Sequence, residues 1–154
     1  MHRIIIDTNL FLAGLFFDKN PEDLLLLGID GQIQIILPIE IVTEVNEKIS
    51  HKFNSHEKLG DAKLFWEVLH KAFLEKPEDI QTDKKSEVVP FVCRDPKDQI
   101  ILDACIKFNP DYFITGDKDI LEIKNPPFPV VKLLTFYQKE FPELIKNTNL
   151  RPQK

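Results

Sequence analysis

The same short pattern occurs near both ends of this chain of 154 residues: an apolar run that leads into carboxylates. Ile4–Ile6 leads directly into Asp7, and Tyr112–Ile114 leads through a Thr-Gly pair to Asp117 and Asp119. Apolar runs of this kind are typical of buried parallel strands. Because ligands bind at the carboxyl ends of strands in open α/β sheets, two strands with acidic ends indicate a cation site.

The composition is that of an ordinary globular domain, 43% hydrophobic and 29% charged. The length predicts one domain over residues 1–146, followed by a loose tail over residues 147–154. No apolar run approaches the roughly 20 residues of a membrane helix, and no signal segment precedes the first strand, so we expect a cytoplasmic protein without membrane spans. Cys93 and Cys105 lack CxxC spacing and are predicted to be free, buried thiols.

The formal net charge of −5 disfavours a broad, non-specific DNA-binding protein, which would be basic. It does not exclude a nuclease, because divalent cations would balance a cluster of carboxylates.

Predicted strands alternate with predicted helices along the chain. The strands are expected at residues 2–7, 33–37, 112–114 and 130–133. The helices are expected at residues 8–17, 20–28 (capped by Asn20 and ended by Gly28), 38–50, 55–76 (with a break at Gly60-Asp61), 95–108 and 135–141 (capped by Thr135). This alternation predicts the α/β class, a three-layer α/β/α sandwich around a central, mostly parallel sheet.

Asp7 is the strongest candidate for a site residue, since an unpaired carboxylate at the end of an all-isoleucine strand would cost several kcal/mol. Its alternative role is to cap the following helix. Thr8 and Asn9 add polar groups that could orient Asp7 or a bound water.

Asp117 and Asp119 follow the later strand, and Thr115-Gly116 permits a sharp turn there. The alternative is an Asp-rich surface turn. Such a turn readily explains one aspartate, but it explains two less well.

Asp95 and Asp98 lie at a predicted helix start, where the helix dipole alone favours acids. We include both as candidates because Asp7, Asp117 and Asp119 already indicate an acidic site that they could join. Asp103 groups with Gln99 and Lys107 opposite the apolar stripe of that helix, so a solvated face explains it.

Glu44 lies beside the apolar stripe of the helix after the second strand, and it could either join the site or simply pair with Lys48. Glu40, one turn earlier, is its rival. The histidines have no HExxH spacing, and the chain has no P-loop and no GxGxxG, which disfavours a zinc or nucleotide site.

This ordered set of motifs, DTN at residues 7–9, Glu44, DPKD at residues 95–98 and TGDKD at residues 115–119, resembles the PIN domain family. It is most similar to the toxin-like, VapC-type proteins of prokaryotes, and the similarity runs from residue 3 to about 137. The chain lacks the Ser often found before the family's Glu, and it has few arginines, so an RNA groove would depend on lysine.

The resemblance implies a ribonuclease that depends on Mg²⁺ or Mn²⁺ and often works with a protein antitoxin. The catalytic acids would be Asp7, Glu44, Asp98 and Asp117, and the metal ligands would be Asp7, Asp98, Asp117 and Asp119, with Thr8, Asn9, Asp95 and Thr115 as accessory residues. Hard cations suit these oxygen ligands. Attack in line would leave a 5′-phosphate and a 3′-hydroxyl.

Two other functions are open. A phosphatase of the haloacid dehalogenase type also begins with an Asp after a strand, but it needs an acid where this chain has Asn9. A PIN-like module could instead bind RNA or protein without cutting. The family often dimerises, and we expect Leu and Phe exposed on residues 10–17 or 24–27 to serve such an interface.

Overall fold

A four-stranded sheet, parallel throughout and in the order β2-β1-β3-β4, forms the centre of the molecule in the computed structural model. The structure describes residues 1–73 and 96–147. The strands are β1 (Arg3–Ile6), β2 (Gln34–Ile36), β3 (Tyr112–Ile114) and β4 (Val130–Val131).

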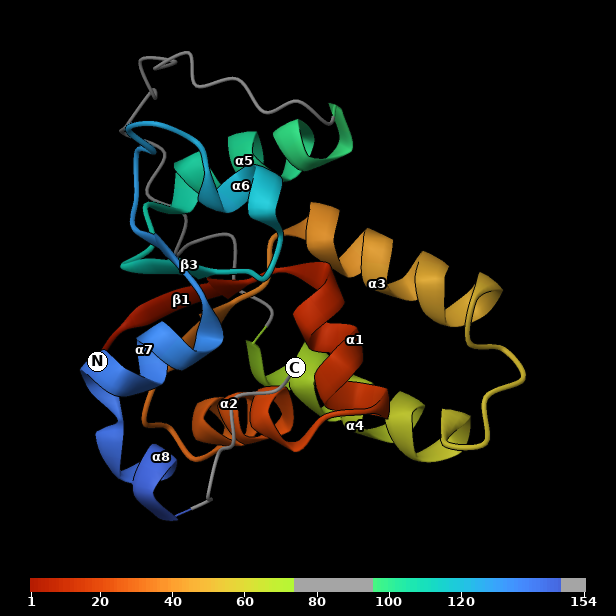
Figure 1. Ribbon diagram of the computed structural model, residues 1–154. Helices are drawn as coiled ribbons and strands as arrows, with labels where there is room; N and C mark the ends of the chain where they lie inside the picture. Colours follow the sequence, from red (N-terminus) through yellow and green to blue (C-terminus); the bar gives the residue numbers. More distant parts are fainter. Residues whose placement is uncertain (74–95, 148–154) are drawn as a thin grey trace.

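Helices cover both faces of this sheet. They are α1 (Thr8–Phe16), α2 (Lys19–Ile29), α3 (Ile39–His51), α4 (Leu59–Phe73), α5 (Pro96–Phe108), α6 (Lys118–Leu121), α7 (Leu133–Glu140) and α8 (Pro142–Asn147). Figure 1 shows α5 and α6 on one side of the sheet and α1, α2 and α4 on the other. The predicted α/β/α sandwich with a parallel sheet is therefore confirmed. None of the described helices is long and apolar enough to cross a membrane.

The isoleucine run at the start of the chain forms β1, which lies between β2 and β3. Ile4 and Ile5 are fully buried, as expected for a strand that is covered on both faces. Ile5 pairs with Ile36 of β2, and Ile6 pairs with Ile114 of β3. The residues that follow these strands therefore meet at one edge of the sheet.

Helix α2 differs from its prediction at both ends. It begins at Lys19 after Asp18 rather than at a cap on Asn20, and Gly28 lies inside it instead of ending it. Gly28 is there because the helix comes close to β2: a Cβ at this position would lie 2.5 Å from Cδ1 of Ile35. The turn after the helix uses Gly31, whose φ is +79°.

Two further helical predictions were wrong, and two short helices were not predicted. Helix α4 begins at Leu59, so Gly60 lies in its first turn rather than at a break. Helix α7 begins after Lys132, which places Thr135 inside the helix and not at its cap. The short helices α6 and α8 were not predicted, because each is less than two turns long and carries little periodic signal.

The expectation that residues 10–17 and 24–27 expose an apolar face was also wrong. Most of their leucines and phenylalanines are core residues: Phe11, Leu12, Leu15, Phe16, Leu24, Leu25 and Leu27 are buried. Phe17 and Leu26 are the exposed exceptions. Helices α1 and α2 pack against each other and against α4, so each buries more than one stripe, which helical spacing alone does not reveal.

Cys105 is a buried free thiol, as predicted. Cys93, Asp95 and residues 148–154 of the predicted tail lie outside the described residues.

Candidate active site

Asp7 lies at the carboxyl end of the central strand and also begins α1. Its N–H donates to the carbonyl of Ile114 at 3.0 Å, which extends the pairing of β1 with β3 by one residue. Its Oδ1 accepts from the N–H of Asn9 at 3.0 Å, as an N-cap does. Asp7 therefore does cap α1, the role given above as its alternative. The cap uses only Oδ1, so Oδ2 is available for another contact.

Thr115 connects the ends of β1 and β3. It is fully buried, and its hydroxyl donates to Oδ2 of Asp7 at 2.5 Å. Oγ1 of Thr115 in turn accepts from the N–H of Asp117 at 3.0 Å. One threonine thereby fixes the position of Asp7 relative to the backbone that carries Asp117.

Asp117 is the N-cap of α6, and its Oδ1 accepts from the N–H of Asp119 at 2.9 Å. Asp117 and Asp119 are both half-buried, so neither behaves as a fully exposed turn residue. Asp117 lines the same groove as Asp7.

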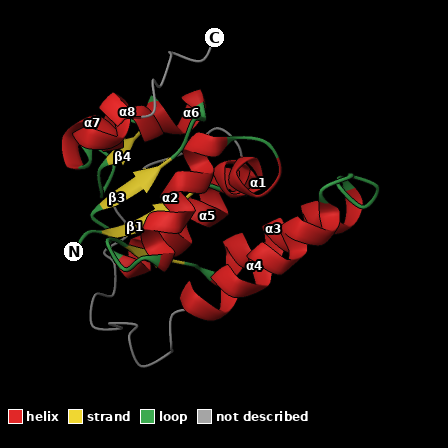
Figure 2. Cartoon of the chain, turned by 90° about the horizontal axis from the view of Figure 1, so that it is seen from below, coloured by secondary structure: helices red, strands yellow, loops and turns green. Residues whose placement is uncertain are grey.

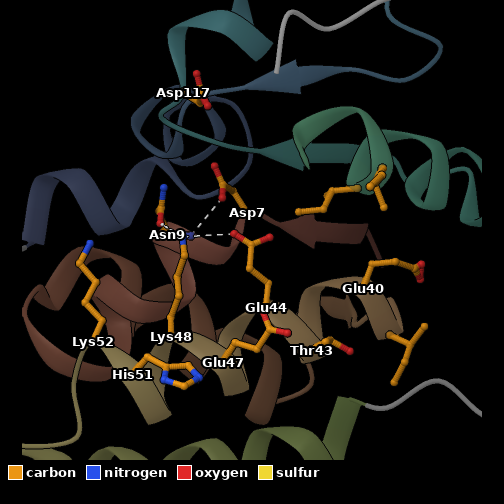
Figure 3. A pocket seen from close by; sticks show the side chains of 13 residues that line it. Asp7, Asn9, Glu40, Thr43, Glu44, Glu47, Lys48, His51, Lys52 and Asp117 are labelled. Atoms are coloured by element: carbon orange, nitrogen blue, oxygen red, sulfur yellow. Dashed lines mark hydrogen bonds and ion pairs between the residues drawn. The ribbon is translucent and has the colours of Figure 1, made fainter. Parts of the chain in front are cut away.

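Glu44 reaches the site from α3. Figure 3 shows its carboxylate directed toward Asp7, whereas Glu40 lies farther to the side. Lys48 of α3 connects this helix to α1. Its Nζ lies 3.2 Å from Oε1 of Glu44 and donates to Oδ1 of Asn9 at 3.0 Å. The pairing of Glu44 with Lys48 that spacing suggested thus exists, and it occurs inside the groove.

Burial raises the pKa of the Asp7 carboxyl above its ordinary value, because burial penalises the charged form. The hydrogen bonds from Thr115 and Asn9 oppose this rise in pKa by stabilising the carboxylate. The negative charges of Asp117 and Glu44 add to the rise. Glu44 and Asp117 therefore both lie within electrostatic reach of Asp7, although Asp117 is 110 positions away in the sequence.

A groove of about 770 Å³ opens over these acids. Its acidic part is lined by Asp7, Glu44 and Asp117, together with Glu40 and Glu47. Lys48, His51 and Lys52 of α3 and its cap line a basic part (Figure 3). A groove with clustered acids beside cationic side chains can hold both a metal ion and a phosphate backbone.

The remaining predicted residues are distributed as follows. Thr8 is buried, and its Oγ1 has no hydrogen-bond partner within residues 1–73 and 96–147. Asp98 lies in the first turn of α5, and its side chain is outside the described part; Ile100 and Ile101 of that helix line the groove. Asp103 is exposed and accepts from Nε2 of Gln99 at 2.9 Å, as predicted for a solvated face.

The donor chemistry suits a hard cation, since Asp7, Glu44 and Asp117 offer only oxygen. Within the described residues, however, no three side chains of His, Cys, Asp or Glu come close enough to hold a metal ion by themselves. The acids fit Mg²⁺ or Mn²⁺ in type, and the described ones do not form a closed ligand shell.

Sequence reasoning missed the role of Lys48, which was considered only as a helical partner of Glu44. Thr115 was expected as an accessory residue, but its hydrogen bond to Asp7 was not predicted. Their contacts to Asn9 and Asp7 join elements 39 and 108 positions apart, so no local pattern announces them.

A family model described as PIN domain matches residues 3–119 of the chain. No curated protein and no solved structure matches this chain. The matched range includes β1, α3, α5 and β3, and it ends at Asp119 beside the groove. Because this range is well over half of the chain, the protein belongs to the PIN domain family.

Proposed function

We propose that this protein is a metal-dependent ribonuclease that hydrolyses phosphodiester bonds in RNA. The observation that carries the proposal is Asp7: a carboxylate at the end of the central strand, tied to Thr115, with Asp117 and Glu44 near enough to raise its pKa. The PIN domain is a nuclease-like fold, which agrees with this chemistry.

In this proposal Asp7, Asp98 and Asp117 hold Mg²⁺ or Mn²⁺, and Asp119 adjoins them as a further ligand. Glu44 orients the attacking water, and it is favoured over Glu40 because its charge is one of those that act on Asp7. When bound, the cation would supply positive charge that polarises the phosphodiester and favours ionisation of water.

The accessory residues act by holding the acids in position. Thr115 donates to Asp7 and receives the N–H of Asp117, so it fixes the spacing of two catalytic acids. The backbone N–H of Asn9 donates to Oδ1 of Asp7, and the side-chain Oδ1 of Asn9 accepts from Lys48. We assign Thr8 and Asp95 to the same supporting group.

For the biological setting we propose a cytoplasmic toxin of the VapC type, with RNA as substrate, a protein antitoxin as partner and a homodimer as its assembly. We also propose that residues 1–146 form one domain with residues 147–154 as a tail. The neighbouring reading frame tests the toxin assignment, since it should encode a small antitoxin.

A second candidate is a PIN-like module that binds RNA or protein without cleavage. One observation favours it: the described acids do not by themselves form a group of three that could hold a metal ion. The two candidates differ in whether RNA is cut.

The test is cleavage of a labelled single-stranded RNA by the purified protein in Mn²⁺. Cleavage should stop in excess chelator and in the variant Asp7→Asn. Asp103→Asn removes an exposed acid on α5 and should leave the rate unchanged. Cleavage that continues in chelator would contradict a metal-dependent mechanism, and metal-independent binding without cleavage would favour the binding module.

A further inference from the structure

Two stripes of side chains run away from the acidic groove, one on α1 and one on α3. Asn9, Ala13 and Phe17 recur at intervals of four on α1 and its cap, and Glu44, Lys48 and Lys52 recur at the same interval on α3 and its cap. Residues at this interval share one face of a helix. Each stripe spans eight residues, which is about 12 Å of helix.

The two stripes lie side by side, because contacts join them at both ends. Near the acids, Nζ of Lys48 donates to Oδ1 of Asn9 at 3.0 Å. At the far end, Phe17 contacts Phe53, the residue that follows Lys52, with ring centroids 5.6 Å apart. Helices α1 and α3 each start beyond the carboxyl end of a parallel strand, so both lead away from the same edge of the sheet.

An aromatic platform, defined as Phe17, Phe53 and His56, stands at the far end of the stripes. The ring of Phe17 lies 5.3 Å from that of His56 in an edge-on arrangement. Phe16 is buried beneath the platform and stacks on Phe53 with centroids 4.4 Å apart. Phe16 thus fixes the loop after α3 to α1, while Phe17 keeps 57% of its surface exposed.

Two lysines, a histidine and Glu47 line the groove along α3 and its cap. Lys48, His51 and Lys52 line this part of the groove, and Figure 3 shows them on the same side of Asp7 as Asn9. Lys48 is engaged by Glu44, whereas Lys52 is exposed and has no carboxylate within ion-pair distance in the described part of the chain. A chain of phosphates complements this side of the groove.

We propose that a single strand of RNA leaves the candidate active site along the α3 stripe, with a phosphate on Lys52 and a base stacked against Phe17. This inference rests on the proposed function and names the residues that contact its RNA substrate beyond the candidate active site. Proteins that bind single strands combine a cationic track with exposed aromatic rings on which bases stack. A base in a duplex is already stacked and paired, so it cannot occupy the platform.

The test measures the affinity of a fluorescein-labelled single-stranded oligoribonucleotide of about 12 nucleotides, in the Asp7→Asn background so that the RNA stays intact. Phe17→Ala should weaken binding roughly 5- to 150-fold, the range expected for loss of one stacked base. Phe17→Tyr keeps the ring and should bind as the parent does.

The contribution of Lys52 on the α3 stripe is measured separately, through the salt dependence of binding. The α3 stripe together with the platform residue Phe17 is called the track. The affinity falls as salt rises, and Lys52→Gln should make this dependence less steep. The slope of log affinity against log salt should become less negative by about 0.7, the contribution of one phosphate contact on a single strand. Lys63→Gln removes an exposed lysine on α4, away from the groove, and should leave the slope unchanged. The duplex of the same sequence should bind more weakly than the single strand.

The outcomes separate this inference from the proposed function. Equal affinity of Phe17→Ala and its parent, at matched thermal stability, would overturn the track even if the wild-type protein cuts RNA. Tight, Phe17-dependent binding by a wild-type protein that does not cut would keep the track and contradict the nuclease. A change in oligomeric mass on Phe17→Ala, with RNA affinity unchanged, would assign the platform to a second copy of the chain and overturn the proposal.

Discussion

Asp7 performs two tasks with its two oxygens. Oδ1 caps α1 through Asn9, and Oδ2 receives the hydroxyl of Thr115 at the edge of the groove. The capping role therefore does not compete with a role in the site; it orients the carboxylate. The cost is burial of a charged group next to Asp117 and Glu44, which raises its pKa.

Replacement of Thr115 tests this arrangement. Thr115→Val keeps the shape but leaves a buried oxygen of Asp7 and the N–H of Asp117 without their partner, so unfolding should become easier by about 1–3 kcal/mol. The pKa of Asp7 should rise further, because the lost hydrogen bond stabilised the charged form. Urea unfolding and an NMR titration of Asp7 measure these effects. Thr115→Ser keeps the hydroxyl, and a pKa shift as large as that of Val would contradict the assigned bond.

The raised pKa of Asp7 also predicts how stability depends on pH in metal-free protein. Between the ordinary value near 3.8 and the folded value, the folded state holds a proton that the unfolded state has lost. This contribution to stability is complete below the unfolded pKa and is lost as pH rises through the folded pKa.

Asp7→Asn cannot ionise, so its stability relative to the wild type should increase with pH across this window. Urea unfolding in chelator from pH 4 to 8 measures the difference between the two proteins. A difference that stays constant with pH would mean that burial does not disfavour the Asp7 carboxylate.

At the scale of helices and strands, the positions of the site residues depend on close approach as much as on hydrophobic pattern. Gly28 allows α2 to pack against β2, since a Cβ there would lie 2.5 Å from Ile35 and 2.8 Å from Phe73. Helix α3 in turn is joined to α4 by the indole of Trp66, which donates to Oδ1 of Asn46 at 2.8 Å. Figure 2 shows both helices to one side of the sheet.

Gly28→Val should destabilise the protein by about 1–3 kcal/mol, because the added atoms must displace buried neighbours. Gly60→Val is the matched control, since nothing lies within 4 Å of a Cβ at that helical position. It should leave stability unchanged or raise it slightly through better helix propensity. Thermal unfolding of both variants decides this point, and equal effects would contradict the close approach of α2 to the sheet.

The sequence was most informative about elements with a strong local signal. The apolar runs of β1 and β3 are continuous in the sequence, so the positions of these strands and of the acids that follow them could be predicted. The limits of α2 could not, because Gly28 is explained by contact with Ile35 rather than by a local stop. Phe11 and Phe16 were expected at an exposed face and are core residues, since only the tertiary structure shows how much of α1 the sheet and α4 cover.

For the whole molecule, topology brings the candidate acids together. Parallel strands bring Asp7 and Asp117 to one edge of the sheet. This could be predicted, because both acids follow buried apolar runs. The order β2-β1-β3-β4, which sets Asp7 between the other groups, has no local signal and was not predicted. Nor could the sequence show that Lys48 would reach across to Asn9.

A cation that binds the folded site should stabilise the whole domain. Mn²⁺ at about 100 times its dissociation constant would add roughly 2.7 kcal/mol, a rise in Tm of about 5–10 °C for a domain of this size. Asp7→Asn should lose most of this rise, and differential scanning calorimetry with and without Mn²⁺ measures it. An equal rise in both proteins would mean that the ion binds elsewhere.

The central claim is that acids from distant parts of the chain form one cation site at the carboxyl edge of the sheet. Calorimetric titration of the purified protein with Mn²⁺ tests it most directly, with Asp7→Asn, Asp117→Asn and Asp98→Asn as site variants and Asp103→Asn as control. We predict that wild type and Asp103→Asn bind alike and that each site variant binds at least tenfold more weakly. Unchanged Mn²⁺ affinity in Asp7→Asn and Asp117→Asn, or no binding by the wild type, would contradict the account.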